Sequence, residues 1–61
     1  MAAKFEIKTD AAGKFGFNLK AASGEIIASS EAYERKSSAL NGIESVRTNA
    51  PIAEIDDQTD N

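Results

Sequence analysis

Two kinds of hydrophobic spacing divide the chain. Over residues 4–20 apolar positions alternate with polar ones, which is the period of a strand with one buried face. The alternating apolar residues are Phe5, Ile7, Phe15, Phe17 and Leu19. They predict two strands, one over residues 4–8 and another over residues 14–20.

Short turns join these strands to each other and to a third. Asp10 followed by Gly13 indicates the first turn, because Asp opens turns and Gly adopts positive φ without strain. Residues 21–24 indicate a second turn and residues 25–29 a third strand, whose Ile26 and Ile27 are expected to point to opposite faces. Short loops between alternating segments predict an antiparallel meander.

A helix is predicted after the third strand. The apolar residues there fall at the spacing of one helix face, and they are Ala39, Leu40, Ile43, Val46 and Ala50. We place the start of the helix near Lys36, with Ser37 or Ser38 as its cap. Propensity alone also allows a start at Glu31.

The chain after the helix is short. The residue before a proline avoids helical dihedrals, so Pro51 ends the helix by about Asn49. Ile52–Asp56 alternates weakly and predicts a fourth strand, and residues 57–61 are polar. The order β-β-β-α-β belongs to the α+β class. We expect a single small domain over residues 1–61, with an ordered core over about residues 4–57.

Composition argues against catalysis. The chain contains no Cys, His or Trp. His and Cys most often carry chemistry near neutral pH or hold transition metals, and a serine nucleophile needs a base such as His. We therefore expect no enzyme activity, catalytic residue, metal site or cofactor. A solvated tail is our interpretation of the acids near the C-terminus, with weak binding of a divalent cation as the alternative; they are Glu54, Asp56, Asp57 and Asp60.

Size and charge point to self-association. A chain of 61 residues buries little core, and without Cys it has no disulfide to stabilise it. Oligomerisation is the remaining means, so we expect an intertwined homodimer. Residues 1–24 carry four lysines against two acids, and residues 25–61 carry three basic residues against eight acids. These opposite net charges, +2 and −5, favour attraction within or between chains. No stretch is apolar enough for a membrane span or a secretion signal, so we expect a cytoplasmic protein.

One sheet face is predicted to be basic. If the alternating apolar residues face the helix, the polar residues between them share the other face, and Glu6 is the one acid among them. The residues of this lysine face are Lys4, Lys8, Lys14, Asn18 and Lys20. It suggests binding of nucleic acid or another polyanion, although it lacks outward aromatic residues for base stacking. Ordinary solubility and protection of the sheet edge are the alternative.

Two glycines stand inside predicted elements. Gly42 in the helix would permit close backbone approach to the sheet or to a partner chain, and Gly16 leaves the outer sheet face locally bare. A weak helix and a bulge are the alternatives. The residues expected to contact the second subunit are Tyr33, Gly42, Val46, Ile52 and Ile55.

Several segments occur in a characteristic order. They are Lys4-Phe5-Glu6-Ile7, Asp10 with Gly13, Phe15 through Ala21, Gly24-Glu25-Ile26-Ile27, Ser30-Glu31 with Tyr33, Leu40 through Val46, and Asn49-Ala50-Pro51. Together they resemble the YegP-like family of small uncharacterised bacterial proteins. The likeness covers residues 4–57. One departure is Arg35, where such sequences tend to place a small hydroxyl residue, so Ser37 is the substitute cap.

The resemblance implies a fold and an assembly. It implies an antiparallel sheet packed on one helix, present once in some members and twice in tandem in others. A single-unit member is expected to pair with itself, and its last strand to complete the partner's sheet. The family has no established activity, so no functional residue carries over. We therefore expect a homodimeric binding or structural module, with polyanion binding by the lysine face as the alternative.

Overall fold

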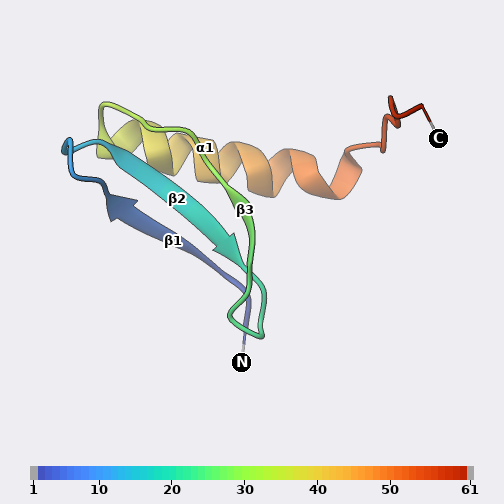
Figure 1. The fold of residues 1–61 in the computed structure, drawn as a ribbon, viewed down its shortest axis with the longest axis horizontal. Helices are drawn as coiled ribbons and strands as arrows, with labels where there is room; N and C mark the ends of the chain where they lie inside the picture. Colours follow the sequence, from blue (N-terminus) through green and yellow to red (C-terminus); the bar gives the residue numbers. More distant parts are fainter. Residues whose placement is uncertain (1, 61) are drawn as a thin grey trace.

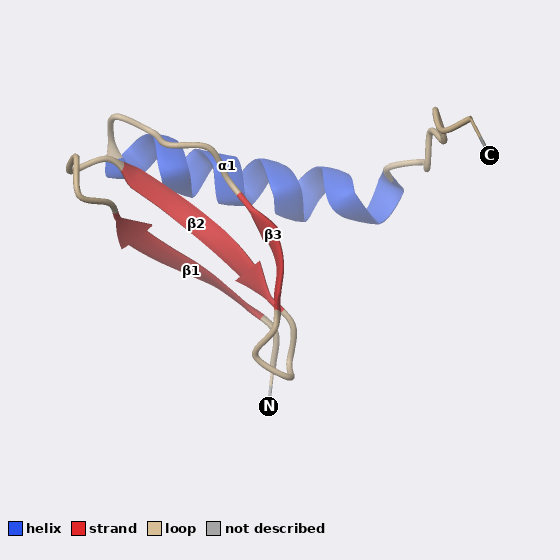
Figure 2. Ribbon diagram, in the orientation of Figure 1, coloured by secondary structure: helices blue, strands red, loops and turns tan. Residues whose placement is uncertain are grey.

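The computed structural model describes residues 2–60 and consists of a three-stranded sheet followed by a helix (Figure 1). The strands are β1 (Lys4–Thr9), β2 (Phe15–Lys20) and β3 (Ile26–Ser29). The helix α1 (Lys36–Asn49) is followed by a 3₁₀ turn, η1 (Ala50–Ile52). The predicted α+β class and the bounds of the helix are confirmed, and the ends of the three predicted strands each agree to within one residue. Figure 2 shows the three strands and the helix.

The sheet is an antiparallel meander with β2 in the centre. Directly opposed residues share a face of the sheet. On one face Phe5 pairs with Leu19 and Ile7 with Phe17. On the other face Lys4 pairs with Lys20, Glu6 with Asn18 and Lys8 with Gly16. The register therefore separates the apolar residues from the lysines, as the alternation predicts.

Asp10 builds the turn between β1 and β2. One of its carboxylate oxygens, Oδ1, accepts hydrogen bonds from the N–H groups of Ala12 and Lys14, both at 2.9 Å. The carbonyl of Asp10 accepts the N–H of Gly13, whose φ of +79° is the left-handed conformation that Gly adopts without strain. The turn signal in the sequence is thus confirmed.

The chain stays beside β2 after β3 ends. A bulge opposite Leu19 and Lys20 interrupts the pairing of β3, because Ala28 faces Leu19 whereas Ile26 faces Lys20. Further along, the Ser30 N–H donates to the carbonyl of Phe17 at 2.9 Å, and the Phe17 N–H donates to the Ser30 hydroxyl Oγ, also at 2.9 Å. The Ser30 side chain therefore takes the place of a backbone carbonyl in the ladder.

Tyr33 restores backbone pairing at the start of β2. Its N–H donates to the carbonyl of Phe15 at 2.7 Å, and the Phe15 N–H donates to the carbonyl of Tyr33 at 2.8 Å. Glu31 and Ala32 lie between the Ser30 and Tyr33 contacts and pair with no strand. This short unpaired stretch leads the chain across to the helix.

The helix begins without a side-chain cap. Arg35 occupies the cap position with extended dihedrals, φ −129° and ψ 147°, and its side chain makes no capping hydrogen bond. The prediction that Ser37 or Ser38 caps the helix is wrong, because both lie inside its first turn. The other end agrees with expectation. Asn49 is the last helical residue, and Pro51 lies within the 3₁₀ turn that comes next.

The core lies between β2 and the helix. Phe17, Ala39 and Ile43 are its buried apolar residues. The Phe17 ring packs edge-on against Phe5, with centroids 5.9 Å apart, and stacks with Tyr33 at 6.4 Å. Leu40, which we expected in the apolar stripe, remains 47% exposed. It is adjacent to the buried Ala39 in sequence, so its position is turned about 100° around the helix from the packed line.

The end of the chain carries no fourth strand within the described residues. Ile52 belongs to the 3₁₀ turn, and residues 53–58 have no regular structure. The predicted strand over Ile52–Asp56 is therefore not seen: Pro51 continues the helix into a turn, and no described strand lies alongside residues 53–56 to pair with them. In Figure 1 the helix runs on past the sheet, and the tail continues away from it.

Among residues 2–60 no helix has the length and apolar character needed to cross a membrane.

Candidate functional site

Ion pairs divide the predicted lysine face. Lys4 and Lys20 are directly opposed across β1 and β2, a like-charge pair that is unfavourable by itself. Glu6 on the same face relieves it, because one of its carboxylate oxygens lies 3.2 Å from the Lys20 ammonium. Lys4 and Lys8 form no ion pair with any described residue. The uncompensated positive charge of the face therefore belongs to β1.

Two further residues of the predicted lysine face, Asn18 and Lys14, already have partners within the chain. Asn18 is only 4% exposed, and its side-chain oxygen accepts a hydrogen bond from the Ser29 hydroxyl at 2.9 Å. Its neighbours in the sheet, Glu6 and Ser29, cover it from both sides. Lys14 lies in the turn before β2, and its ammonium pairs with Glu34 at 3.4 Å. The Asn18 side chain is therefore buried within the sheet and is not available to bind a polyanion at the surface.

The residues predicted to contact a second subunit fall into two groups. Tyr33 and Gly42 lie against each other beside the core: a Cβ at Gly42 would be 2.8 Å from the Tyr33 hydroxyl oxygen and 3.1 Å from Phe17. The close approach that Gly42 permits is therefore made within this chain. Val46 is half-buried one turn further along the helix.

The second group, Ile52 and Ile55, lies past the end of the helix and is exposed to solvent. Ile52 is 75% exposed and Ile55 is 96% exposed. On the sheet, Ile26 and Ile27 of β3 are also more than half exposed. These two residues were expected on opposite faces, but their exposure was not predicted from the sequence. Both lie in an edge strand, and Ile27 is the residue that the bulge leaves without a partner on β2.

A shallow pocket opens where the lysine face meets the segment after β3. Its lining comes from the end of β1, the first turn, the start of β2 and residues 30–32, and it includes Lys8, Lys14 and Gly16. The pocket itself was not predicted from the sequence. The one sequence feature that pointed to it is Gly16, which leaves the outer sheet face without a side chain at that position.

Outside the pocket, one carboxyl group has a shifted pKa. The hydroxyl of Thr59, and then its N–H, donates to Asp57 and lowers the pKa of that carboxyl below its ordinary value of 3.8. Asp57 lies in the exposed tail, so this is a local contact. No group of three or more acidic, His or Cys side chains converges on a metal site within residues 2–60.

Comparison with known proteins gives one consistent result. Residues 10–57 match the model of a domain family described as a domain of unknown function, DUF1508. A UPF0339 protein of Treponema denticola is 60% identical over 55 residues, which span 90% of this chain and 95% of that protein. The UPF0339 protein YegP of Yersinia pestis is 57% identical over 47 residues, which span 77% of this chain and 42% of that protein.

Some relatives are about twice as long. The UPF0339 protein PA0329 of Pseudomonas aeruginosa is 62% identical over 50 residues, and the match covers 82% of this chain but 46% of that protein. Among solved structures, the NMR solution structure of a protein from Haloferax volcanii superimposes with a TM-score of 0.83 at 42% identity. The match covers 92% of this chain and 95% of that one.

Proposed function

The chain belongs to the DUF1508 family of domains of unknown function, and from this premise we propose that it acts as a homodimeric binding or structural module. The observation that carries the proposal is the tail. Ile52 and Ile55 are large apolar side chains that are 75% and 96% exposed. Apolar side chains left bare beside a small core favour burial against a second copy of the chain.

The core of the single chain supports the same proposal. Its buried apolar residues are Phe17, Ala39 and Ile43, a small set for a domain without disulfides. The relatives of about twice this length also support it, because such a chain has room for two units of this size side by side.

Charge favours docking of the tail on the sheet of the partner. Between residues 53 and 60 the chain carries four acids and no basic residue. Lys4 and Lys8 on β1 have no ion pair with any described residue and would attract such a segment. In this arrangement residues 52–56 gain from the partner the strand neighbour that they lack in their own chain, and the exposed edge of the sheet is covered.

Light scattering on a sizing column, across a dilution series, tests the dimer. We expect a mass of twice the 6.5 kDa chain, falling toward one chain only at high dilution. The double variant Ile52→Asp/Ile55→Asp should shift the equilibrium toward monomer. Leu40→Asp is the control, since Leu40 is an exposed apolar residue near the other end of the helix. A folded monomer at every concentration would contradict the proposal.

A second candidate function is polyanion binding by the lysine face. The observation in its favour is the pair of uncompensated lysines, Lys4 and Lys8, on one side of β1. The proposal predicts retention on heparin at low salt that weakens steeply as salt rises. Lys4→Gln and Lys8→Gln should each reduce the salt dependence by about one counterion, whereas the helical Lys36→Gln should not. Equal effects of all three variants would indicate attraction to net charge alone.

A further inference from the structure

The pocket beside Gly16 has a volume of about 170 Å³ and is built entirely from one chain. It exists because two irregularities coincide. Gly16 leaves the sheet surface without a side chain, and Glu31 and Ala32 pass over it without pairing to β2. A Cβ at position 16 would project toward Ser30 Oγ at 3.5 Å and the Glu31 carbonyl oxygen at 3.8 Å. The floor of the pocket is therefore bare backbone.

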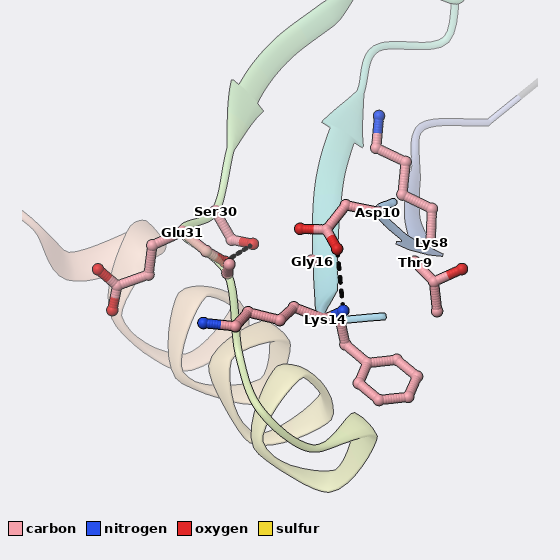
Figure 3. Close-up of a pocket in the computed structure, with 9 residues that line it drawn as sticks. Lys8, Thr9, Asp10, Lys14, Gly16, Ser30 and Glu31 are labelled. Carbon is pink, nitrogen blue, oxygen red and sulfur yellow. Dashed lines mark hydrogen bonds between the residues drawn. The ribbon is translucent and has the colours of Figure 1, made fainter. Parts of the chain in front are cut away.

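Two side chains of the pocket lining, Asp10 and Ser30, offer hydrogen-bond acceptors beside Gly16. Figure 3 shows the Asp10 carboxylate and the Ser30 hydroxyl facing each other across Gly16. The Ser30 hydroxyl already donates its proton to the Glu31 carbonyl at 2.8 Å, so toward a ligand it can only accept. Asp10 uses Oδ1 for the turn, and its other oxygen, Oδ2, has no hydrogen-bond partner among the described residues.

Positive charge stands at the rim. Lys8 and Lys14 both line the pocket from the β1–β2 side. Lys14 is partly neutralised by Glu34, whereas Lys8 has no ion pair with a described residue. In Figure 3 the Lys8 side chain extends past Asp10 with its ammonium at the upper edge. A ligand that enters thus meets oxygen acceptors inside and a free ammonium at the mouth.

This arrangement disfavours ligands of a single charge. A simple anion would place its charge near the Asp10 carboxylate, and a simple cation would place its charge near Lys8. A divalent metal ion of the calcium type needs six or more oxygen ligands. Two acidic residues line this pocket, Asp10 and Glu31, and in Figure 3 the Glu31 carboxylate points away from Gly16. A small molecule that carries both charges a few bonds apart satisfies both ends.

We propose that the pocket binds the zwitterionic head of an α-amino acid. The ammonium group donates to Asp10 Oδ2 and Ser30 Oγ above Gly16, and the carboxylate accepts from the Lys8 ammonium at the rim. All of these groups come from one chain, so a single chain suffices to bind the ligand. In the proposed dimer the acidic tail of the partner and the carboxylate of the ligand would compete for Lys8. The pocket is open, and we expect weak affinity, with a dissociation constant on the order of 1–10 mM.

Amide NMR titration of the full chain tests this, using three probes at equal ionic strength. L-alanine carries both charges, propionate only the negative one and ethylamine only the positive one. We expect alanine to shift the amides of Gly16, Ser30 and Glu31 saturably, and each single-charge probe to bind about fivefold or more weakly. No saturable shift with alanine overturns the proposal. Equal binding of propionate or ethylamine also overturns it, and identifies a plain anion or cation site instead.

Matched variants separate the two ends of the ligand. Asp10→Asn keeps the Oδ1 acceptor that the turn requires and removes the charge, while Lys8→Gln removes the ammonium at the rim. Both should weaken alanine binding about tenfold, and Lys4→Gln, a lysine on the same strand outside the pocket, should leave it unchanged. Gly16→Ala should abolish binding while the amide spectrum stays folded, because its Cβ meets only ordinary van der Waals contacts. Unchanged binding in Gly16→Ala and Lys8→Gln overturns the assignment.

Discussion

The hydroxyl of Tyr33 lies against the backbone of Gly42, so closely that a Cβ at position 42 would be 2.8 Å from its oxygen. The Tyr33 ring is not free to retreat. It stacks on Phe17, and its backbone is fixed to Phe15 by two hydrogen bonds. The helix therefore needs glycine at this point, although glycine is a poor helix former.

Gly42→Ala should destabilise the protein. Helix propensity alone predicts a gain of about 1 kcal/mol, but the added methyl group clashes with Tyr33 and Phe17, and overpacking of this kind costs about 1–3 kcal/mol. We expect a lower midpoint in urea or thermal unfolding. Tyr33→Phe in the same background should recover part of the loss, because it removes the nearest atom. A variant as stable as the parent would contradict the packing described for Gly42.

Ser30→Ala should remove one rung of the ladder. The Phe17 N–H would lose its acceptor in a partly buried place, which costs about 1–3 kcal/mol. Urea unfolding measures the loss, and the amide of Phe17 should become faster to exchange. Ser37→Ala is the matched control, because Ser37 is exposed in the first helical turn and does not cap the helix. Equal losses in the two variants would show that the Ser30 hydroxyl has no special role.

Arg35→Ser should stabilise the protein. Position 35 already has the extended dihedrals of a helix cap, and the first turn contains no acidic residue. A hydroxyl there can accept from the free N–H groups of the first turn, which contributes about 0.5–2 kcal/mol. The unfolding midpoint should rise. Ser37→Asn, which introduces a good capping residue inside the helix, should not raise it.

The contact between Asp57 and Thr59 should titrate below pH 3.8. Since the hydrogen bonds lower the pKa of Asp57, the contact is present at neutral pH and is lost as the pH falls through that lowered pKa. The Thr59 amide and the Asp57 carboxyl carbon, observed by NMR, should share one midpoint. Thr59→Ala should move the Asp57 midpoint upward, toward 3.8. A midpoint in the parent chain at or above that value would contradict the contact.

Most of the fold can be predicted from periodicity. The alternation around Phe17 and the spacing of Ala39, Ile43 and Val46 are strong signals, because each repeats over several residues. The end of the helix was also predictable, since Pro51 acts locally. The fourth strand was not. A strand is defined by its neighbour, and the weak alternation of residues 52–56 says nothing about whether one is present.

The candidate sites depended on contacts that the sequence does not encode locally. Alternation places Asn18 on the lysine face, but only the register shows that Glu6 and Ser29 cover it. Nothing at Arg35 marks a cap, because its side chain takes no part in capping. The pocket required Ser30 to replace a backbone carbonyl and residues 31–32 to leave the sheet. Gly16 alone gave a hint of it.

The central place of β2 has a consequence for how the molecule opens. Both edge strands pair with β2, and the helix packs on it through Phe17. Either edge strand can detach while β2 keeps its remaining neighbours, but β2 itself is released only when the whole structure comes apart. In native-state hydrogen exchange the two edges should therefore open separately. The amide of Phe17, which donates to Ser30, should exchange when the β3 side opens and independently of the amides of β1.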